Sequence, residues 1–473
     1  MISASSIDSR SRSGVDCRGL TLSYNDPEAI AGLERAHEAS LAFGGDAIAL
    51  IDEVIAKHPD FIMAHIFKAG WLTQAMETRI YVEMKDAVRA AERLADRAND
   101  RERGHFTAVW RWLEGDFAGA VSAWEEVAIA YPRDLLAIQL AHLSDVLLGD
   151  TVGQRDVVAR AFKSWDETVP GYAFMLGFYA FGLEEMRDFE RAETMARRSL
   201  DLVPDNPYAV HALGHVMESQ GRIEEGIAFF KAEQPRWEHT SFANHLWWHL
   251  ALYYFDKDDV GAVLGIYDRH LRSVDPNSYQ ELDAAALLWR LKLLDVDLAD
   301  RWSELADKWT HAATNALYAF NDAHAMMTFV GDDRHDVQDT LLLANDRHAQ
   351  CGRDTNAMMI REVGLPLCRA LQDFHRGSYE ACVERLMPIR YRTHLLGGSH
   401  AQRDVIGLTL LEAALRAGRF PLAWALASER FELRPNSIRN REFLMRARKG
   451  LEDSGVILPA NADRIDHELE RAS

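Results

Sequence analysis

Apolar residues recur at steps of three and four along most of the chain, for example over residues 116–131, 189–203 and 223–231. This spacing places them on one face of an α-helix. The alternation of apolar and polar residues that marks a half-buried strand is almost absent. The pattern therefore predicts an all-α protein. Prolines follow several of the helical stretches, where a helix is expected to stop: Pro132, Pro204 and Pro435.

A longer repeat is superimposed on the helical one. Its signature is a turn residue, an apolar residue two positions later, a small residue three after that and a bulky residue four further on. Gly115, Phe117, Ala120 and Trp124 show this order. Two of the intervals between turn positions are 34 residues and a third is 37. The turn positions are Gly115, Gly149, Arg187, Gly221, Asp258 and Gly418.

A period of about 34 residues is typical of the tetratricopeptide repeat, in which each unit is a pair of antiparallel helices. The small residue lets the two helices approach, and the bulky residue fills the gap to the next unit. We therefore expect a tetratricopeptide-like helical-repeat solenoid, curled around a concave pocket. Its expected parts are a flexible N-terminal tail (1–20), an N-terminal array (21–330) and C-terminal repeats that continue the same solenoid (331–473).

The charge of the chain limits the partners that the protein can bind, and its cysteine content indicates the cellular compartment. The chain has 53 Lys and Arg against 73 Asp and Glu, which gives a formal net charge of −20. Nucleic acids and anionic membranes are bound by basic surfaces, so we expect neither as a partner. No apolar run reaches the ~18 residues of a membrane span. Four cysteines without CxxC spacing favour a reduced, cytoplasmic protein: Cys17, Cys351, Cys368 and Cys382.

Four separated motifs resemble the tetratricopeptide repeat protein 38 family. They are NPYAVHALGHVMESQGRIEEGIAFF (206–230), NHLWWHLALYYFD (244–256), FNDAHAMMTFV (320–330) and GGSHAQRDV (397–405). The resemblance extends from about Leu20 to about Leu451. It implies an all-helical repeat fold and supplies no reaction, so the chemistry is argued from the residues themselves.

Two of these motifs carry histidine pairs spaced by four residues, His211 with His215 and His245 with His249. This spacing puts both imidazoles of a pair on one helix face. The first helix of a tetratricopeptide unit lines the concave groove. Counting back from Gly221 and Asp258 places both pairs on adjacent first helices that face one groove. The same count puts Tyr208 and Glu218 on that face.

Three interpretations of the paired histidines stay open. They are a polar groove lining, a site that binds a small ligand or does acid–base chemistry, and a metal site. Neither pair contains the glutamate of the HExxH zinc motif. We take the second interpretation, with His211, His215, His245 and His249 as candidate catalytic residues, and we assign no metal ligand and no cofactor.

Further polar residues could complete a pocket with the histidines. The segment 320–330 carries a polar triplet, Asn321, Asp322 and His324. Buried polar groups cost free energy unless they are paired, so this triplet suggests a network. The alternative is a helix edge exposed to solvent. On 397–405 the order of Ser399 and Gln402 is typical of a helix capping box, and His400 adds a candidate proton donor. Candidate ligand-binding residues, besides Tyr208 and Glu218, are Trp248, Asn321, Asp322, His324, Arg403 and Asp404.

The resulting hypothesis is a helical-repeat protein whose histidine-lined groove binds a small polar ligand and acts on it by hydrolysis, elimination or isomerisation. The alternative is a non-catalytic scaffold that binds a peptide or partner protein, and a homo-oligomer is possible in either case. The enzyme hypothesis requires the C-terminal helices to curl back onto the groove. His400 should then lie within about 15 Å of the central histidines.

Overall fold

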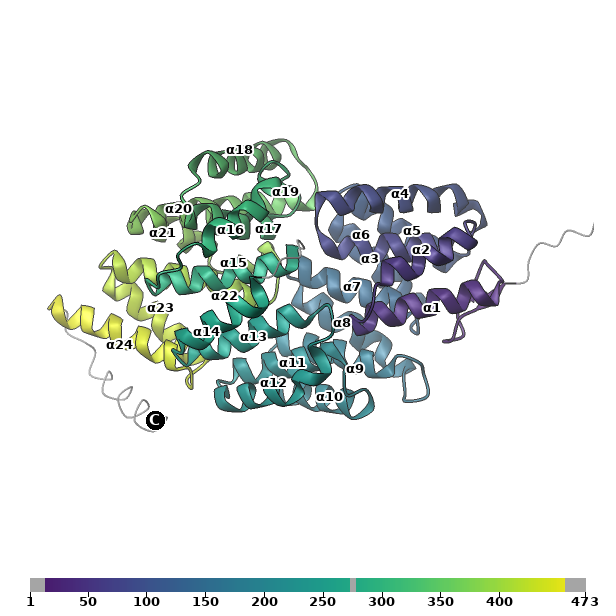
Figure 1. Cartoon of the computed structure of the whole chain (residues 1–473), viewed down its shortest axis with the longest axis horizontal. Helices are drawn as coiled ribbons and strands as arrows, with labels where there is room; N and C mark the ends of the chain where they lie inside the picture. Colours follow the sequence, from purple (N-terminus) through teal and green to yellow (C-terminus); the bar gives the residue numbers. More distant parts are fainter. Residues whose placement is uncertain (1–12, 273–277, 456–473) are drawn as a thin grey trace, which may run out of the picture.

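The structure is a computed structural model that describes residues 13–272 and 278–455. It is built almost entirely of helices packed in antiparallel pairs (Figure 1). The tetratricopeptide-like helical-repeat solenoid is thus confirmed. The elements up to the middle of the chain are β1 (Gly14–Val15), β2 (Thr21–Leu22), α1 (Pro27–Ala42), α2 (Ala47–Lys57), α3 (Ile62–Leu72), α4 (Thr78–Leu94), α5 (Asp100–Leu113), α6 (Phe117–Ala130), α7 (Leu135–Leu148), α8 (Thr151–Ala161), α9 (Tyr172–Glu185), α10 (Phe189–Leu202), α11 (Pro207–Ser219) and α12 (Ile223–Trp237).

Helices of the second half also pack against helices that are near them in the chain, for example α16 against α17, α20 against α21 and α23 against α24. Short 3₁₀ or π-helical turns extend some of the helices, such as the π turns Tyr267–Leu271 and Ile360–Gly364. The helices are α13 (Ala243–Asp256), α14 (Val260–Ile266), α15 (Ser278–Leu293), α16 (Arg301–Trp309), α17 (Ala319–Gly331), α18 (His335–Cys351), α19 (Thr355–Met359), α20 (Leu365–His375), α21 (Tyr379–Leu386), α22 (His400–Arg416), α23 (Phe420–Leu433) and α24 (Ile438–Asp453).

The part of the expected N-terminal tail that the structure describes is folded. Gly14–Val15 pairs with Thr21–Leu22 in a short antiparallel hairpin. Arg101 of α5 holds this hairpin by donating a hydrogen bond to the carbonyl of Thr21 (3.2 Å). The composition of the segment hides this, because the hairpin depends on a partner about 80 residues further along the chain.

The turn positions of the sequence repeat are where the backbone adopts a left-handed conformation. Such a conformation ends a helix by satisfying its last carbonyl groups. Small residues lie where the repeat places them, as Gly226 does. A Cβ on Gly226 would lie only 2.2 Å from the ring of Tyr253. Helices α12 and α13 therefore approach as closely as glycine permits. The turn residues with positive φ are Gly115 (82°), Gly149 (69°), Arg187 (63°), Gly221 (67°), Asp258 (62°) and Gly418 (69°).

The C-terminal half folds back onto this row of turns. Figure 1 shows α22 beside the central helices α13 and α15, and contacts between α15 and α22 agree with it. At Gly149 a Cβ would lie 1.9 Å from the carbonyl oxygen of His394, so this turn needs glycine for close approach as well as for its φ. Four hydrogen bonds mark the closure: Thr355 N to Gly115 O (3.1 Å), Gly398 N to Val146 O (2.8 Å), Asn436 Nδ2 to Gln220 O (3.3 Å) and Arg439 Nη2 to Asp258 Oδ1 (2.7 Å).

Candidate metal centre

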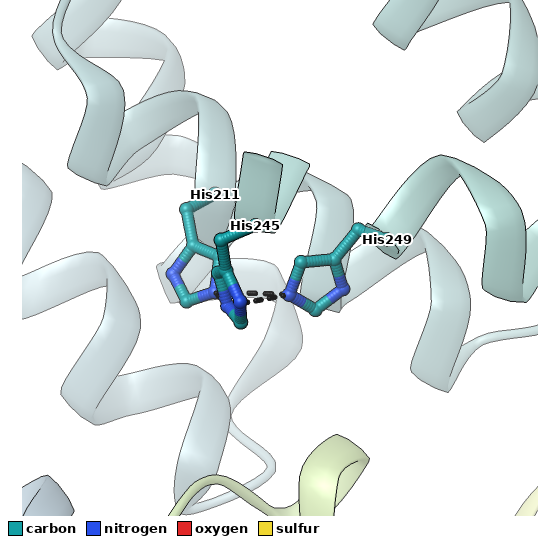
Figure 2. A group of neighbouring side chains, drawn as sticks. All are labelled: His211, His245 and His249. Carbon is teal, nitrogen blue, oxygen red and sulfur yellow. Dashed lines mark hydrogen bonds between the residues drawn. The ribbon is translucent and has the colours of Figure 1, made fainter. Parts of the chain in front are cut away.

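Three imidazoles from two adjacent helices meet at one point. Helix α11 supplies His211, and helix α13 supplies His245 and His249 (Figure 2). Their Nε2 atoms form a triangle in which each pair is 3.1 Å apart. The register predicted from the repeat, with these imidazoles facing each other across neighbouring hairpins, is therefore what the structure shows.

A carboxylate behind one ring indicates where that imidazole carries its proton. His245 Nδ1 lies 2.8 Å from Asp283 Oδ2 on α15. A carboxylate on one ring nitrogen favours the proton there and leaves the other nitrogen with a free lone pair. The Nε2 lone pair of His245 therefore points into the triangle. His249 Nδ1 lies 3.6 Å from Glu218 Oε2 on α11, beyond hydrogen-bond distance.

Burial disfavours a positive charge on two of the three rings. The pKa values of His211 and His249 are well below the ordinary range, first because both rings are buried and then because neighbouring histidines disfavour a further positive charge. Each Nε2 atom either carries a proton or offers a lone pair, so among three such atoms in mutual contact at least one contact pairs two like groups. A cation at the centre would remove this conflict.

The triangle has the dimensions of a metal site. Zinc–nitrogen bonds are about 2.0–2.1 Å, so three nitrogens on one face of a zinc ion stand roughly 3.0 to 3.4 Å apart. Imidazole also suits copper, iron and nickel. Three protein ligands on one face leave the other face for water or substrate, which is the arrangement of catalytic metal sites. The geometry thus favours the metal interpretation, although no metal ligand was assigned from the sequence.

A second polar cluster lies directly beside the triangle. The ring of His215 on α11 is centred 4.4 Å from that of His211 and 5.2 Å from that of His400 at the start of α22. Glu184 at the end of α9 joins this pair: its Oε1 accepts from His400 Nε2 (2.8 Å), and its Oε2 lies 3.2 Å from His215 Nδ1. Ser219 also donates to Glu184 Oε1 (3.0 Å). The requirement that His400 lie within about 15 Å of the central histidines is met.

His400 carries a positive charge at neutral pH. Burial alone would lower its pKa, but the carboxylates of Glu184 and Glu185 outweigh burial and raise the pKa of His400 to about 9. Glu184 correspondingly has a pKa below its usual range, because the adjacent His400 and His215 outweigh its own burial. The Nδ1 atom of His400 has no hydrogen-bond partner in the described part of the chain, so it is free to donate a proton or a hydrogen bond.

Solvent reaches part of each cluster. Of the side chains, 31% of His400, 20% of Arg434 and 13% of His245 are exposed. Arg434 donates to Glu218 Oε1 (3.1 Å) and thereby ties the segment after α23 to α11.

The predicted ligand-binding residues divide between the surroundings of the two clusters and more distant packing. Glu218 lies 3.6 Å from His249, Asp404 pairs with Arg430 (2.6 Å), and Arg403 approaches Glu185 (3.6 Å). Trp248 is fully buried and stacks on the His245 ring.

Tyr208 lies one turn before His211 on α11 but packs among Phe43 and Phe178. Its predicted role at the site therefore has no support from direct contact with the imidazoles.

The polar triplet on α17 is buried, so the alternative of an exposed helix edge is wrong. Its groups bond to nearby backbone: Asn321 Nδ2 donates to Met76 O (3.1 Å), and His324 Nδ1 lies 2.7 Å from Phe320 O. Asp322 Oδ2 has no hydrogen-bond partner in the part of the chain that the structure describes. None of the hydrogen bonds or ring contacts found there joins the triplet to the imidazoles.

Sequence reasoning missed the carboxylates that orient the histidines. Asp283 is a single aspartate in an apolar helix, and Glu184 and Glu185 close α9 just before the turn at Arg187. Position in the repeat is the signal that could have found them, because Glu184 and Glu185 occupy the end of a first helix as Glu218 does. Asp283 has no such signal in the sequence.

Comparison with known proteins bears on the architecture only. No family model matches the chain. Solved structures with a similar fold include the human IFIT1 dimer with m7Gppp-AAAA, at 14% identity and a TM-score of 0.40, over 91% of this chain and 96% of that one. A monomeric IFIT1 mutant with Gppp-AAAA matches at 15% identity and a TM-score of 0.35, over 89% and 99%.

These matches correct one expectation drawn from the charge. Net negative charge was taken to exclude nucleic acids as partners, yet proteins with this general architecture have been solved with capped RNA. A net charge does not describe the local charge of a binding surface, so the exclusion was wrong. The likeness is too distant to assign any ligand to this chain. No helix among the described residues is long and apolar enough to cross a membrane.

Proposed function

We propose that the protein is a metal-dependent enzyme of the hydrolase class that acts on a small polar molecule. The observation that carries the proposal is the triangle of Nε2 atoms of His211, His245 and His249, 3.1 Å apart, with Asp283 behind the ring of His245. An ion held there would lower the pKa of a bound water toward about 7 and so provide a hydroxide nucleophile at neutral pH.

The neighbouring cluster supplies the proton transfer that hydrolysis needs. His400 is protonated and held at Nε2 by Glu184, and its ring contacts that of His215, which in turn contacts His211 of the triangle. In hydrolysis the nucleophilic water loses a proton and the leaving group gains one, and a positioned imidazolium can donate the latter. The resemblance to the tetratricopeptide repeat protein 38 family stays a prediction, supported by the order of its four motifs.

Metal titration tests the proposal directly. The chelator-treated protein is titrated with Co²⁺, whose visible spectrum reports nitrogen coordination, and with Zn²⁺ in competition. We expect one tight equivalent for the wild type. His211→Ala and His249→Ala should each weaken binding by more than about 100-fold, because each loses a ligand rather than only a supporting residue. Hydrolysis of p-nitrophenyl acetate should follow metal content.

His142→Ala is the matched control. His142 is also a fully buried imidazole of low pKa, on α7, and it contacts the backbone of Gln154 instead of the triangle. This variant loses a buried ring but should keep the metal. Absence of stoichiometric metal in the wild type, or equal loss in the control, would contradict the proposal and leave the scaffold alternative.

A further inference from the structure

Arg290 on α15 is a buried cation without a carboxylate partner. Only 2% of the residue is exposed. Its guanidinium donates to two backbone carbonyls, Nη1 to Ala286 O (3.1 Å) and Nη2 to Ala401 O (2.8 Å). Within the described residues no aspartate or glutamate oxygen lies within ion-pair distance of it. An arginine has five N–H donors in a planar fork, and two backbone bonds leave part of that fork unused.

The nearest carboxylates do not neutralise this charge because other arginines already engage them. Asp404 forms ion pairs with Arg430 (2.6 Å) and Arg434 (3.3 Å), and Glu218 forms one with Arg434 (3.1 Å). Burial lowers the pKa of Arg290 to about 10, which still leaves it charged at neutral pH. A charge buried without a counter-ion is costly, so its retention indicates that an anion arrives from outside the chain.

The position of Arg290 connects it to the triangle. Its guanidinium carbon lies 5.5 Å from the centre of the Trp248 ring, and Trp248 in turn stacks on His245 with ring centres 5.3 Å apart. Ala401, which accepts its hydrogen bond, follows His400, the protonated and partly exposed residue of the second cluster. The Trp248 ring therefore lies between Arg290 and His245 of the triangle. The residue that Arg290 bonds, Ala401, is next to His400 in the chain.

From this placement we propose that Arg290 binds an anionic group of the substrate, so that the molecule acted on is a small organic anion with a carboxylate or a phosphate. The planar guanidinium fork matches either group through two parallel hydrogen bonds. His400 would face the same anion from α22. The proposal rests on the metal centre for the reaction, but the anion site itself can be tested in metal-free protein.

The test measures anion binding by isothermal titration calorimetry in the full-length, metal-free chain. Inorganic phosphate and acetate are the two probes and distinguish the two groups, and sodium chloride at equal ionic strength is the blank. We expect one equivalent of one probe to bind. Arg290→Met should weaken that binding about 10- to 100-fold, the range for a charge-assisted hydrogen bond. Co²⁺ binding by Arg290→Met should match that of the wild type.

Arg439→Met is the matched control, because Arg439 is also buried but is paired with Asp258 (2.7 Å) and with the carbonyl of Phe255. It should bind the probe normally and lose thermal stability. Arg290→Met should lose less, since it removes an unpaired buried charge. Failure of the wild type to bind either probe, or unchanged binding in Arg290→Met, would overturn the proposal. Arg290-dependent anion binding without any metal binding would refute the metal centre alone.

Discussion

The imidazole triangle on α11 and α13 and the polar triplet on α17 are both buried sets of polar side chains, but their atoms are satisfied differently. Asn321 and His324 bond to backbone carbonyls nearby, so they stabilise packing. The Nε2 atoms of the triangle have only one another. Buried polar groups in general find partners within the fold. Ring nitrogens that converge on one point and have no such partner mark a place where a ligand is required.

The largest effect that tests this contrast is expected at Asp322. Burial raises the pKa of its carboxyl from 3.8 to about 7, so the folded protein keeps a proton that the unfolded chain releases near pH 4. Stability therefore falls as the pH rises from about 4 to about 7. Asp322→Asn should be more stable than the wild type by on the order of 3 kcal/mol above pH 7 and equal to it below pH 4.

Urea unfolding of the two proteins between pH 4 and pH 8 measures this difference, and the comparison cancels the opposite titration of His324. A variant that is less stable at pH 8 would show that the Asp322 carboxylate is charged and partnered in the folded state. The triplet would then resemble a second site instead of packing.

A smaller effect is expected at Asp283, the carboxylate behind His245. Asp283→Asn leaves all three imidazoles in place but weakens the preference for a proton on Nδ1 of His245. Supporting residues of this kind change metal affinity by about 10- to 100-fold. Co²⁺ titration should therefore show weaker binding in Asp283→Asn and unchanged binding in Asp322→Asn. Equal affinity in both variants would mean that the carboxylate does not orient the ring.

The smallest effect is expected at His400, which is partly exposed to solvent. Its pKa of about 9 lies above the ordinary 6.5, so its ion pair with Glu184 stabilises the fold fully below pH 6.5. That contribution is lost as the pH rises through about 9. The stability advantage of the wild type over His400→Gln should shrink by on the order of 1 kcal/mol between pH 7 and pH 9.5.

Chemical unfolding at the two pH values checks this expectation, and the exposed His335→Gln on α18 is the control. A constant advantage of the wild type over His400→Gln would mean that the ion pair with Glu184 has no net effect on stability.

Sequence periodicity was sufficient to predict the structural features that depend on residues close together in the chain. Turn residues such as Gly115 and Asp258 were placed correctly because a helix that ends in a left-handed turn has few alternatives to glycine, asparagine or aspartate. The capping box of Ser399 and Gln402 is present for a similar local reason. The two histidine pairs lie close together, as expected from the register that the repeat gives to the two helices.

What the sequence could not supply depends on how the solenoid closes. Arg290 reaches the site through the carbonyl of Ala401, 111 residues away along the chain. Glu184 meets His400 across 216 residues. Such pairs follow from the curvature of the whole array, which is the sum of small rotations between repeats and is not encoded in any one of them. The metal interpretation was undecided for the same reason, since it requires distances between rings.

Open helical arrays gain or lose units easily, because each unit touches only the next, and they can melt piecemeal from either end. The return of α22 onto the row of turns removes that freedom here. Hydrogen bonds spanning as many as 245 residues convert a linear stack into a closed loop. Shortening the chain by its last hairpins would therefore leave the three imidazoles in place but remove the contacts that Arg434 makes with α11. Denaturation of the intact chain should be a single, slow and cooperative event.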